Sequence, residues 1–195
     1  MFSSVFSRVL TISLLLGLAA CATPPSRINN VCSVFDQRDG FLNNWYSAAK
    51  RAERKHGIPV HVLMATVRKE SGFKSNARPP RTKLLGFIPW KHQSTALGYS
   101  QALNGTWSQY QRETGSFAAR RTNFADAVDF VGWYHAKTVR NHGVAATDTY
   151  RLYGAYYLGW GGFKRSWPAS LKKYARATDE MARNYQTQMQ SCGRK

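Results

Sequence analysis

Hydrophobic residues recur at intervals of three and four positions along most of the chain, and this spacing is typical of helices that bury one face. The periodicity predicts helices at about residues 40–55, 59–72, 104–113 and 123–140, one from 147 into a glycine-rich and aromatic run at 154–163, and a last one from Pro168 to just before Cys192. With 195 residues and no internal repeat, the chain is expected to form one mainly helical domain.

Several boundaries of these helices can also be predicted. Asn104 and Asn123 are expected to cap the helices that follow them, because an asparagine side chain accepts a hydrogen bond from the first turn. Thr147 is expected to open a helix, and Gly143 to end the one before it. The spacing in the last helix predicts a buried side formed by Leu171, Tyr174, Thr178, Met181, Tyr185 and Met189.

The stretch 73–96 has neither helical nor alternating periodicity. Three prolines interrupt it, and basic residues alternate with large apolar ones. We expect an irregular loop that can contain a short β-hairpin, and loops of this length in compact domains are often functional. Two interpretations stay open: an arm that holds an acidic sugar polymer, and a surface insertion without a role.

The helix predicted at 59–72 places a carboxyl group at the edge of an apolar face. The stripe that begins at Val60 runs through Val67 and, three residues further, reaches Glu70 in the last turn. An apolar environment and the negative end of the helix dipole both disfavour the ionised carboxylate. A protonated carboxyl group is what an acid catalyst needs. The alternative is a solvated glutamate that happens to end a helix.

The charge and composition of the chain narrow the possible partners. Its 28 Lys and Arg against 10 Asp and Glu give a net charge of +18, which favours a polyanion such as nucleic acid, an anionic membrane or an acidic wall polymer. The basic residues are scattered and match no nucleic-acid motif, so no nucleic acid is expected. The five histidines show no ligand spacing with cysteine or acidic residues, so neither a metal nor another cofactor is expected.

The N-terminus predicts an export signal. An apolar run from Val9 to Leu18 follows Arg8; it is too short to span a bilayer and fits a signal peptide. The sequence Leu18-Ala19-Ala20-Cys21 that closes it resembles the lipobox of bacterial lipoproteins. That resemblance implies a signal peptide at 1–20, a lipidated Cys21 with a tether at 21–38, and a domain at 39–195. An ordinary signal peptide with a coincidental cysteine is the alternative.

The lipobox has consequences for localisation and for the other two cysteines. It implies anchoring to a membrane through Cys21, and Ala22 resembles a sorting signal for the periplasmic face of the outer membrane. Cys32 and Cys192 then remain in an exported, oxidising compartment, where we expect them to form a disulfide. Two unpaired thiols are the alternative.

Four short motifs, in order, resemble the lytic transglycosylases of bacterial cell walls. The motifs are Glu70-Ser71-Gly72-Phe73, Gly98-Tyr99-Ser100-Gln101, Thr106-Trp107 and Ala155-Tyr156-x-x-Gly159. Together they span most of the expected domain. The chain departs from the family pattern in the longer gap between Glu70 and Gln101, at Tyr99 and Ser100, and at Tyr157 and Leu158, which concerns substrate preference more than the reaction.

The resemblance implies a lysozyme-like, mainly α (α+β) fold: a single helical domain with a groove and at most a small β-hairpin. It implies that peptidoglycan is the substrate, and that Glu70 is the single catalytic acid and then base that forms 1,6-anhydro-MurNAc. It also implies that Ser71, Gln101 and Tyr156 bind the substrate, with Tyr156 forming a hydrogen bond near Glu70 that helps to orient it. A core tyrosine is the alternative for Tyr156. Protein partners cannot be named from the sequence.

The number of carboxyl groups fits this reaction. Hydrolytic glycosidases usually need two, and the matched motifs contain only Glu70. Asp126 and Asp129 lie on a helix where capping and packing explain them. One carboxyl group suffices when the sugar's own hydroxyl, and not water, attacks. A muramidase that uses water, a non-catalytic peptidoglycan-binding lipoprotein and a nucleic-acid-binding protein are the alternatives, and the export signal opposes the last.

Overall fold

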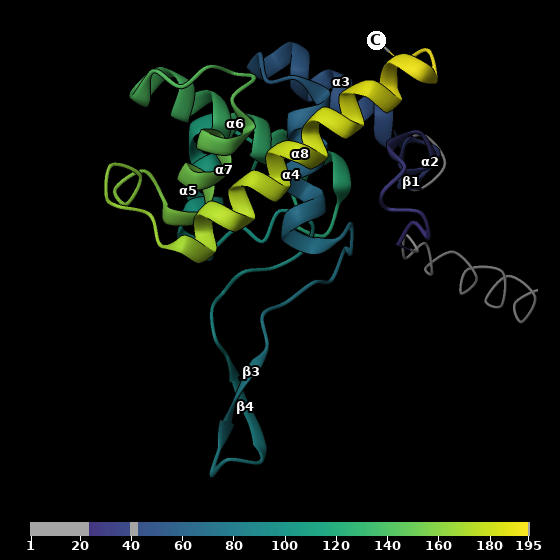
Figure 1. Ribbon diagram of the computed structural model, residues 1–195. Helices are drawn as coiled ribbons and strands as arrows, with labels where there is room; N and C mark the ends of the chain where they lie inside the picture. The colour runs from purple at the N-terminus through teal and green to yellow at the C-terminus, as the bar shows by residue number, and fades with distance from the viewer. Residues whose placement is uncertain (1–23, 40–42, 195) are drawn as a thin grey trace, which may run out of the picture.

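The computed structural model describes residues 24–39 and 43–194, so the expected signal peptide at 1–20 and the lipidation at Cys21 lie outside the described residues. The described chain is mainly helical, with two small antiparallel strand pairs (Figure 1). Its elements are α2 (Val31–Phe35), β1 (Arg38–Asp39), β2 (Asn43–Asn44), α3 (Trp45–His56), α4 (Val60–Ser71), β3 (Arg81–Leu84), β4 (Ile88–His92), α5 (Asn104–Thr114), α6 (Phe124–His142), α7 (Thr149–Leu158) and α8 (Ala169–Ser191). No helix within these ranges is long and apolar enough to cross a membrane.

Helix α4 lies at the centre of the helical body. It contacts α3, α6 and α8, so it is covered from several directions. Val62, Ala65 and Thr66 are buried as well as the apolar stripe that the periodicity predicted. Helix α4 is therefore buried on more than the one apolar face that the periodicity predicted. The sequence pattern does not show how many neighbours surround a helix.

Most predicted helix ends are confirmed. Gly72 ends α4 and Gly143 ends α6, both in the left-handed conformation that favours glycine. Asn123 caps α6, and its side chain accepts a hydrogen bond from the Asp126 backbone N–H.

Three predicted helix starts are wrong. Asn104 is the first residue of α5 and not its cap, and its side chain accepts a hydrogen bond from Arg121 instead. Asp148, not Thr147, caps α7. Helix α3 begins at Trp45, because the short β1–β2 pair occupies the residues just before it.

Stacked aromatic rings join α3 to α6. The Trp45 ring stacks on Phe124 with centroids 4.1 Å apart, and Tyr99 meets both rings edge-on. The Asp39 carboxylate accepts hydrogen bonds from the Trp45 indole at 3.1 Å and from the Phe124 backbone N–H at 2.6 Å. One carboxylate in β1 therefore holds the indole and the first turn of α6 in place.

Helix α8 crosses the body diagonally and packs on α4 and α7 (Figure 1). Its buried residues are Leu171, Ala175, Thr178, Ala182, Tyr185 and Met189. The expectation that Tyr174 and Met181 are buried is wrong, since Tyr174 is exposed and Met181 is only half-buried. The Lys69 ammonium lies 4.0 Å from the centre of the Tyr174 ring, a cation–π contact at the surface.

The expected tether at 21–38 extends too far along the chain. Residues 31–35 form helix α2, whose Val31, Val34 and Phe35 are fully buried in the main core. The domain therefore begins before residue 39. Burial of these apolar side chains explains why the segment packs and does not stay a solvated linker.

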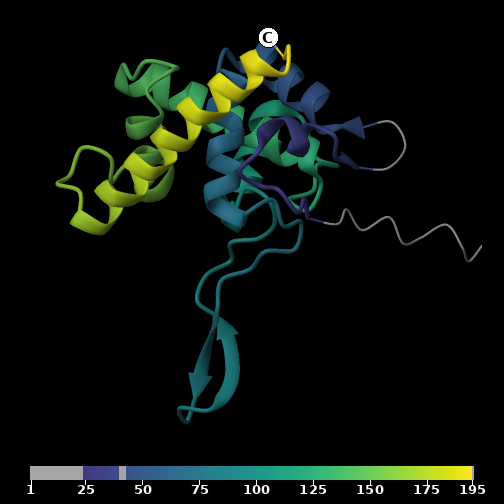
Figure 2. The ribbon, with the colours of Figure 1, turned by 45° about the vertical axis from the view of Figure 1, so that its right-hand side comes forward.

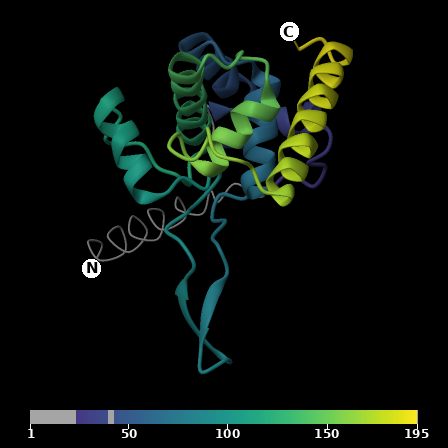
Figure 3. The same ribbon diagram turned by 60° about the vertical axis from the view of Figure 1, so that its left-hand side comes forward.

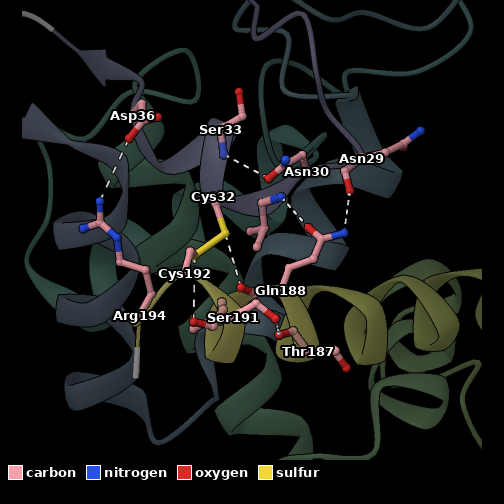
Figure 4. Close-up of a disulfide and its surroundings, with 12 residues drawn as sticks. Asn29, Asn30, Cys32, Ser33, Asp36, Thr187, Gln188, Ser191, Cys192 and Arg194 are labelled. Carbon is pink, nitrogen blue, oxygen red and sulfur yellow. Dashed lines mark hydrogen bonds and ion pairs between the residues drawn. A yellow bond between two sulfur atoms is a disulfide. The ribbon is translucent and has the colours of Figure 1, made fainter.

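The predicted disulfide joins α2 to the end of α8 (Figure 4). The Cα atoms of Cys32 and Cys192 are 6.5 Å apart, across 160 positions of sequence. Beside it, the Gln188 side chain accepts a hydrogen bond from Val31 N–H at 2.8 Å and donates one to the Asn29 carbonyl at 3.0 Å. These contacts tie the two ends of the described chain together.

The hairpin expected within 73–96 is present as β3 and β4. It projects away from the helical body in all three ribbon views (Figures 1, 2 and 3). The strands pair antiparallel, with Arg81 opposite His92 and Lys83 opposite Pro89. The fold expectation of a mainly helical domain with a small hairpin is therefore confirmed.

The disulfide should contribute measurably to stability. Residues 24–194 contain every element above, so a chain that starts at residue 22, here called the soluble chain, keeps these contacts. Because the disulfide closes a long loop, we expect Cys32→Ser/Cys192→Ser to lose about 2–5 kcal/mol of unfolding free energy. Urea unfolding measures this, and reductant should destabilise only the wild type. Equal midpoints for wild type and double variant would contradict the prediction.

Candidate active site

Glu70 lies in the last turn of the central helix α4. Gly72 ends that helix, with its N–H bonded to the Arg68 carbonyl at 3.0 Å, and Phe73 follows with φ 63° and a fully buried ring. A non-glycine residue with positive φ is strained, so the buried Phe73 ring must hold the turn in this shape. The turn therefore fixes where α4 stops and where the Glu70 side chain emerges.

The environment of Glu70 raises its pKa to about 7. Burial is the largest cause, while a hydrogen bond from the Tyr153 hydroxyl and the positive charge of Lys69 both lower the pKa. The residue nevertheless keeps some solvent exposure. Glu70 is therefore a partly buried carboxyl group at the end of its helix. The expected rise in pKa is confirmed, and the group can be protonated or ionised near neutral pH.

Tyr153 is a partner of Glu70 that the motif comparison missed. It precedes Tyr156 by three residues in α7, so both side chains lie on one face of that helix. Both tyrosines have their pKa raised, chiefly by burial and next by the charge of Glu70. The i, i+3 spacing is a signal that could have pointed to Tyr153 once Tyr156 had been chosen.

Tyr156 connects α7 to the turn at 98–101. Its hydroxyl donates a 2.6 Å hydrogen bond to the Ser100 carbonyl, 56 positions away. The structure thus places Tyr156 near Glu70, where its pKa responds to the Glu70 charge, but directs its hydroxyl to Ser100. Any effect of Tyr156 on the orientation of Glu70 passes through packing and this turn.

Gln101 lies in the same turn in a strained conformation. Its φ is 50°, and its amide nitrogen donates to the carbonyls of Gly98 at 2.8 Å and Ala77 at 2.9 Å. These two bonds hold the side chain and leave its amide oxygen as an acceptor. Strain of this kind is typical of functional positions.

A cavity of about 200 Å³ lies between this turn and α7. Gln101 and Thr106 line it on one side, Tyr156 to Gly159 on another, and Phe130 and Tyr134 of α6 form its floor. Hydroxyl groups, an amide and aromatic rings together suit a sugar, which needs hydrogen bonds at its edges and an apolar face.

Ser71 and Trp107, although part of the matched motifs, face the protein interior. The Ser71 hydroxyl is buried and donates to the Val67 carbonyl of its own helix at 3.2 Å. The Trp107 ring packs against Tyr110 and Phe130. Substrate binding by Ser71 stays a prediction, and the geometry gives this residue a structural contact.

No second carboxyl group influences the pKa of Glu70. All ten acidic side chains lie in the described ranges, and only Lys69 among charged residues appears as a cause of its shift. Asp126 accepts a hydrogen bond from the Arg120 N–H at 2.8 Å. Asp129 accepts from Tyr110 at 2.7 Å and from Lys55 at 2.8 Å, and His56 lies 2.9 Å away. Burial alone would raise the pKa of the Asp129 carboxyl, but the bonds to these three residues together lower it to about 2. Structural contacts therefore account for both aspartates, although for Asp129 these are ion pairs and a tyrosine hydrogen bond and not the expected capping and packing.

His135 is a buried residue that packs against Tyr156. Its ring lies 5.5 Å from the Tyr156 ring, and its Nε2 is 3.0 Å from the Thr66 hydroxyl. Burial lowers the pKa of His135 to about 3, so the imidazole is neutral near neutral pH and acts by packing. Within the described ranges, His135 and the other His, Cys, Asp and Glu residues form no cluster that could hold a metal ion.

Comparisons with known proteins identify the family. The model of the family described as Transglycosylase SLT domain matches residues 9–192, so the chain belongs to that family and the resemblance in its motifs is confirmed. No curated protein matches the chain. Among solved structures it is similar to an inactive mutant of the lytic transglycosylase Slt from Pseudomonas aeruginosa, with 16% identity and a TM-score of 0.44. That similarity covers 84% of this chain and 28% of that protein.

The raised pKa of Glu70 should make stability depend on pH. Below pH 4.5 the group is protonated whether folded or not; as pH rises to about 7, the unfolded chain releases the proton while the folded one keeps it. Folding therefore loses up to about 3 kcal/mol across this window. We expect Glu70→Gln to match the wild type near pH 4 and to exceed its stability at pH 8, measured by urea unfolding of the soluble chain. A difference that is independent of pH would contradict the prediction.

Proposed function

We propose that this chain is a peptidoglycan lytic transglycosylase that cleaves the β-1,4 bond between MurNAc and GlcNAc. The observation that carries the proposal is a single partly buried carboxyl group with a pKa of about 7. It lies near Tyr156, which lines a cavity of about 200 Å³ and whose pKa is raised by the Glu70 charge. Membership of the transglycosylase family supports the same reaction.

In the first step, protonated Glu70 donates its proton to the glycosidic oxygen. The bond from the anomeric carbon of MurNAc to that oxygen breaks, and GlcNAc leaves with a new hydroxyl group. The oxocarbenium-like MurNAc is stabilised by its own N-acetyl group, as in substrate-assisted glycosidases. Tyr153 then donates a hydrogen bond to the new carboxylate, which is the state that this bond favours.

In the second step, the Glu70 carboxylate accepts the proton of the MurNAc 6-hydroxyl. The oxygen of that hydroxyl bonds to the anomeric carbon and closes the 1,6-anhydro ring, so Glu70 is protonated again and no water is consumed. A pKa near neutrality suits a group that must donate and then accept a proton. The Gln101 amide oxygen and the cavity hydroxyls would hold the sugar.

The lack of a second carboxyl group favours this reaction over hydrolysis. Retaining and inverting glycosidases place a second carboxylate roughly 5–9.5 Å from the acid, where its charge would raise the pKa of that acid. No such contribution acts on Glu70. A muramidase would need another group to position water.

The proposed location rests on the N-terminal sequence. A lipid on Cys21 would hold the enzyme at the periplasmic face of the outer membrane, next to the wall. Cleavage before Cys21 would remove Arg8 and leave a net charge of +17, which would concentrate the enzyme on peptidoglycan, whose peptide stems carry carboxylates.

Digestion of purified sacculi tests the reaction. We expect the soluble chain to release anhydro-muropeptides, and Glu70→Gln to lower the release by at least about 100-fold, because an amide cannot donate the proton. Mass spectrometry identifies the products, and Glu180→Gln, an exposed glutamate on α8, is the matched control.

Each other result has a distinct meaning. Products with a reducing end and no anhydro ring would establish a muramidase. No product from wild type or variant, with binding to sacculi retained, would mean that the chain only binds the wall.

The Tyr153 hydrogen bond should set the pH range of activity. Because Glu70 must be protonated to act as the acid, activity should fall as pH rises through about 7. The bond from Tyr153 lowers the pKa of Glu70, so Tyr153→Phe should move this fall to higher pH. Tyr150→Phe, on the same helix against Trp167, should leave the profile unchanged. A Tyr153→Phe profile that moves to lower pH, or not at all, would contradict the assignment.

A further inference from the structure

The β3–β4 hairpin carries a concentration of exposed apolar side chains. Leu85 is 75% exposed, Phe87 72%, Trp90 52% and Ile88 40%. These are four of the eight large hydrophobic residues that are exposed in the described chain. Leu85 and Phe87 lie in the loop that joins β3 to β4, and Ile88 and Trp90 lie in β4. This loop is the far end of the projecting hairpin (Figures 1 and 3). We call these four residues the apolar tip. Exposed apolar clusters usually mark interaction sites.

Positive charge follows immediately behind the apolar tip. Lys83 is opposite Pro89 in the strand register, and Arg81 is opposite His92, while Lys91 lies next to Trp90; all three cations are exposed. The stretch 74–97 contains no aspartate or glutamate. Leu85, Phe87 and Ile88 thus lie at or next to the loop, while the strands behind them carry the cations together with Trp90.

The hairpin is held to the body in a defined direction. At its base the Gln93 N–H donates to the Pro80 carbonyl at 3.1 Å, and the Gly98 N–H donates to the Ala77 carbonyl at 2.9 Å. The Ala77 carbonyl also accepts the hydrogen bond from the Gln101 side chain. The base of the hairpin is therefore tied to the turn that lines the candidate active site, while its tip extends away from the body (Figure 2).

We propose that the hairpin docks the domain on an anionic lipid bilayer, with the apolar tip inserted among the acyl chains and the cations on the lipid phosphates. The order of the side chains matches the layers of a membrane surface. Apolar groups belong below the headgroups, tryptophan is favoured at the interface, and Lys and Arg bind the anionic headgroups.

The chemistry of the apolar tip favours lipid over a glycan or an acidic protein. A sugar polymer is bound through hydrogen bonds to its hydroxyl groups, and Leu85, Phe87 and Ile88 have no polar side-chain atoms to offer. A two-stranded ribbon also presents no concave surface that could enclose a chain. Charge complementarity with anionic headgroups, together with apolar side chains in front of the cations, is what an inserting hairpin requires.

Vesicle co-sedimentation of the soluble chain tests the proposal. This chain starts after Cys21, so the predicted lipid cannot contribute to its binding. We expect binding to phosphatidylglycerol-containing vesicles and much weaker binding to phosphatidylcholine vesicles. Leu85→Ser/Phe87→Ser, which keeps the charge, should lower the affinity at least about tenfold. Lys83→Gln/Lys91→Gln, which keeps the apolar tip, should lower it by about fivefold for each lysine, and added salt should reduce this effect.

Matched substitutions elsewhere provide the controls. Phe117→Ser replaces a phenylalanine that is 71% exposed, and Lys172→Gln/Lys173→Gln removes two exposed lysines from α8. Both should leave vesicle binding nearly unchanged. Thermal unfolding checks that every variant is folded, and the serine substitutions should not destabilise the body because the tip does not pack on it.

Three outcomes would overturn the proposal. In the first, the wild type does not bind anionic vesicles. In the second, the tip variants bind these vesicles as well as the wild type does. In the third, the tip variants lose binding to sacculi but not to vesicles, which would assign the hairpin to the wall. Release of muropeptides from sacculi without lipid should be the same for wild type and tip variants. Failure of docking is therefore measured separately from failure of the proposed catalysis.

Discussion

Burial of the Glu70 carboxyl group is the constraint on which the rest of the site depends. A carboxylate loses hydration when protein surrounds it, so the group retains its proton up to about pH 7. That surrounding exists because α4 is packed against α3, α6 and α8, and because the tyrosines of α7 face the end of α4. Within α7, Gly154 leaves room for the Trp167 ring, since a Cβ there would lie 1.9 Å from that ring. The acid is therefore a property of how the helices pack.

Most of the other acidic residues take part in structural contacts, and only Glu70 has a carboxyl pKa raised to about 7. Asp39 and Asp148 bond to helix N-termini, Asp129 lies in a network of three donors, and Glu113 pairs with Lys137 at 2.6 Å. With so few carboxylates and so many cations, the chain as a whole carries a strong positive field. The positive field attracts an anionic polymer over a long distance, whereas burial keeps the Glu70 carboxyl group protonated through its immediate surroundings.

Helix α2 and the β3–β4 hairpin differ in whether their apolar side chains are buried. Helix α2 buries its apolar residues and is closed onto α8 by the Cys32–Cys192 disulfide (Figure 4). The β3–β4 hairpin leaves its apolar residues in solvent, which is unfavourable for an isolated two-stranded ribbon in water. In the proposed docking, the bilayer removes the apolar side chains of the hairpin from water. The apolar side chains of α2 are removed from water by packing in the main core.

The sequence by itself determined the helices, the glycines that end them, the position of Glu70 at the end of α4 and the pairing of the two cysteines, because periodicity, caps and motifs are local signals. Only the tertiary structure decided that α2 belongs to the core, that Tyr174 faces out, that Ser71 turns inward and that Tyr153 reaches Glu70. Each of these depends on which helix lies opposite, and helical spacing carries no information about the neighbour. Sequence and tertiary structure both determine the raised pKa of Glu70. The direction of the shift follows from the apolar stripe, and its size follows from the packing.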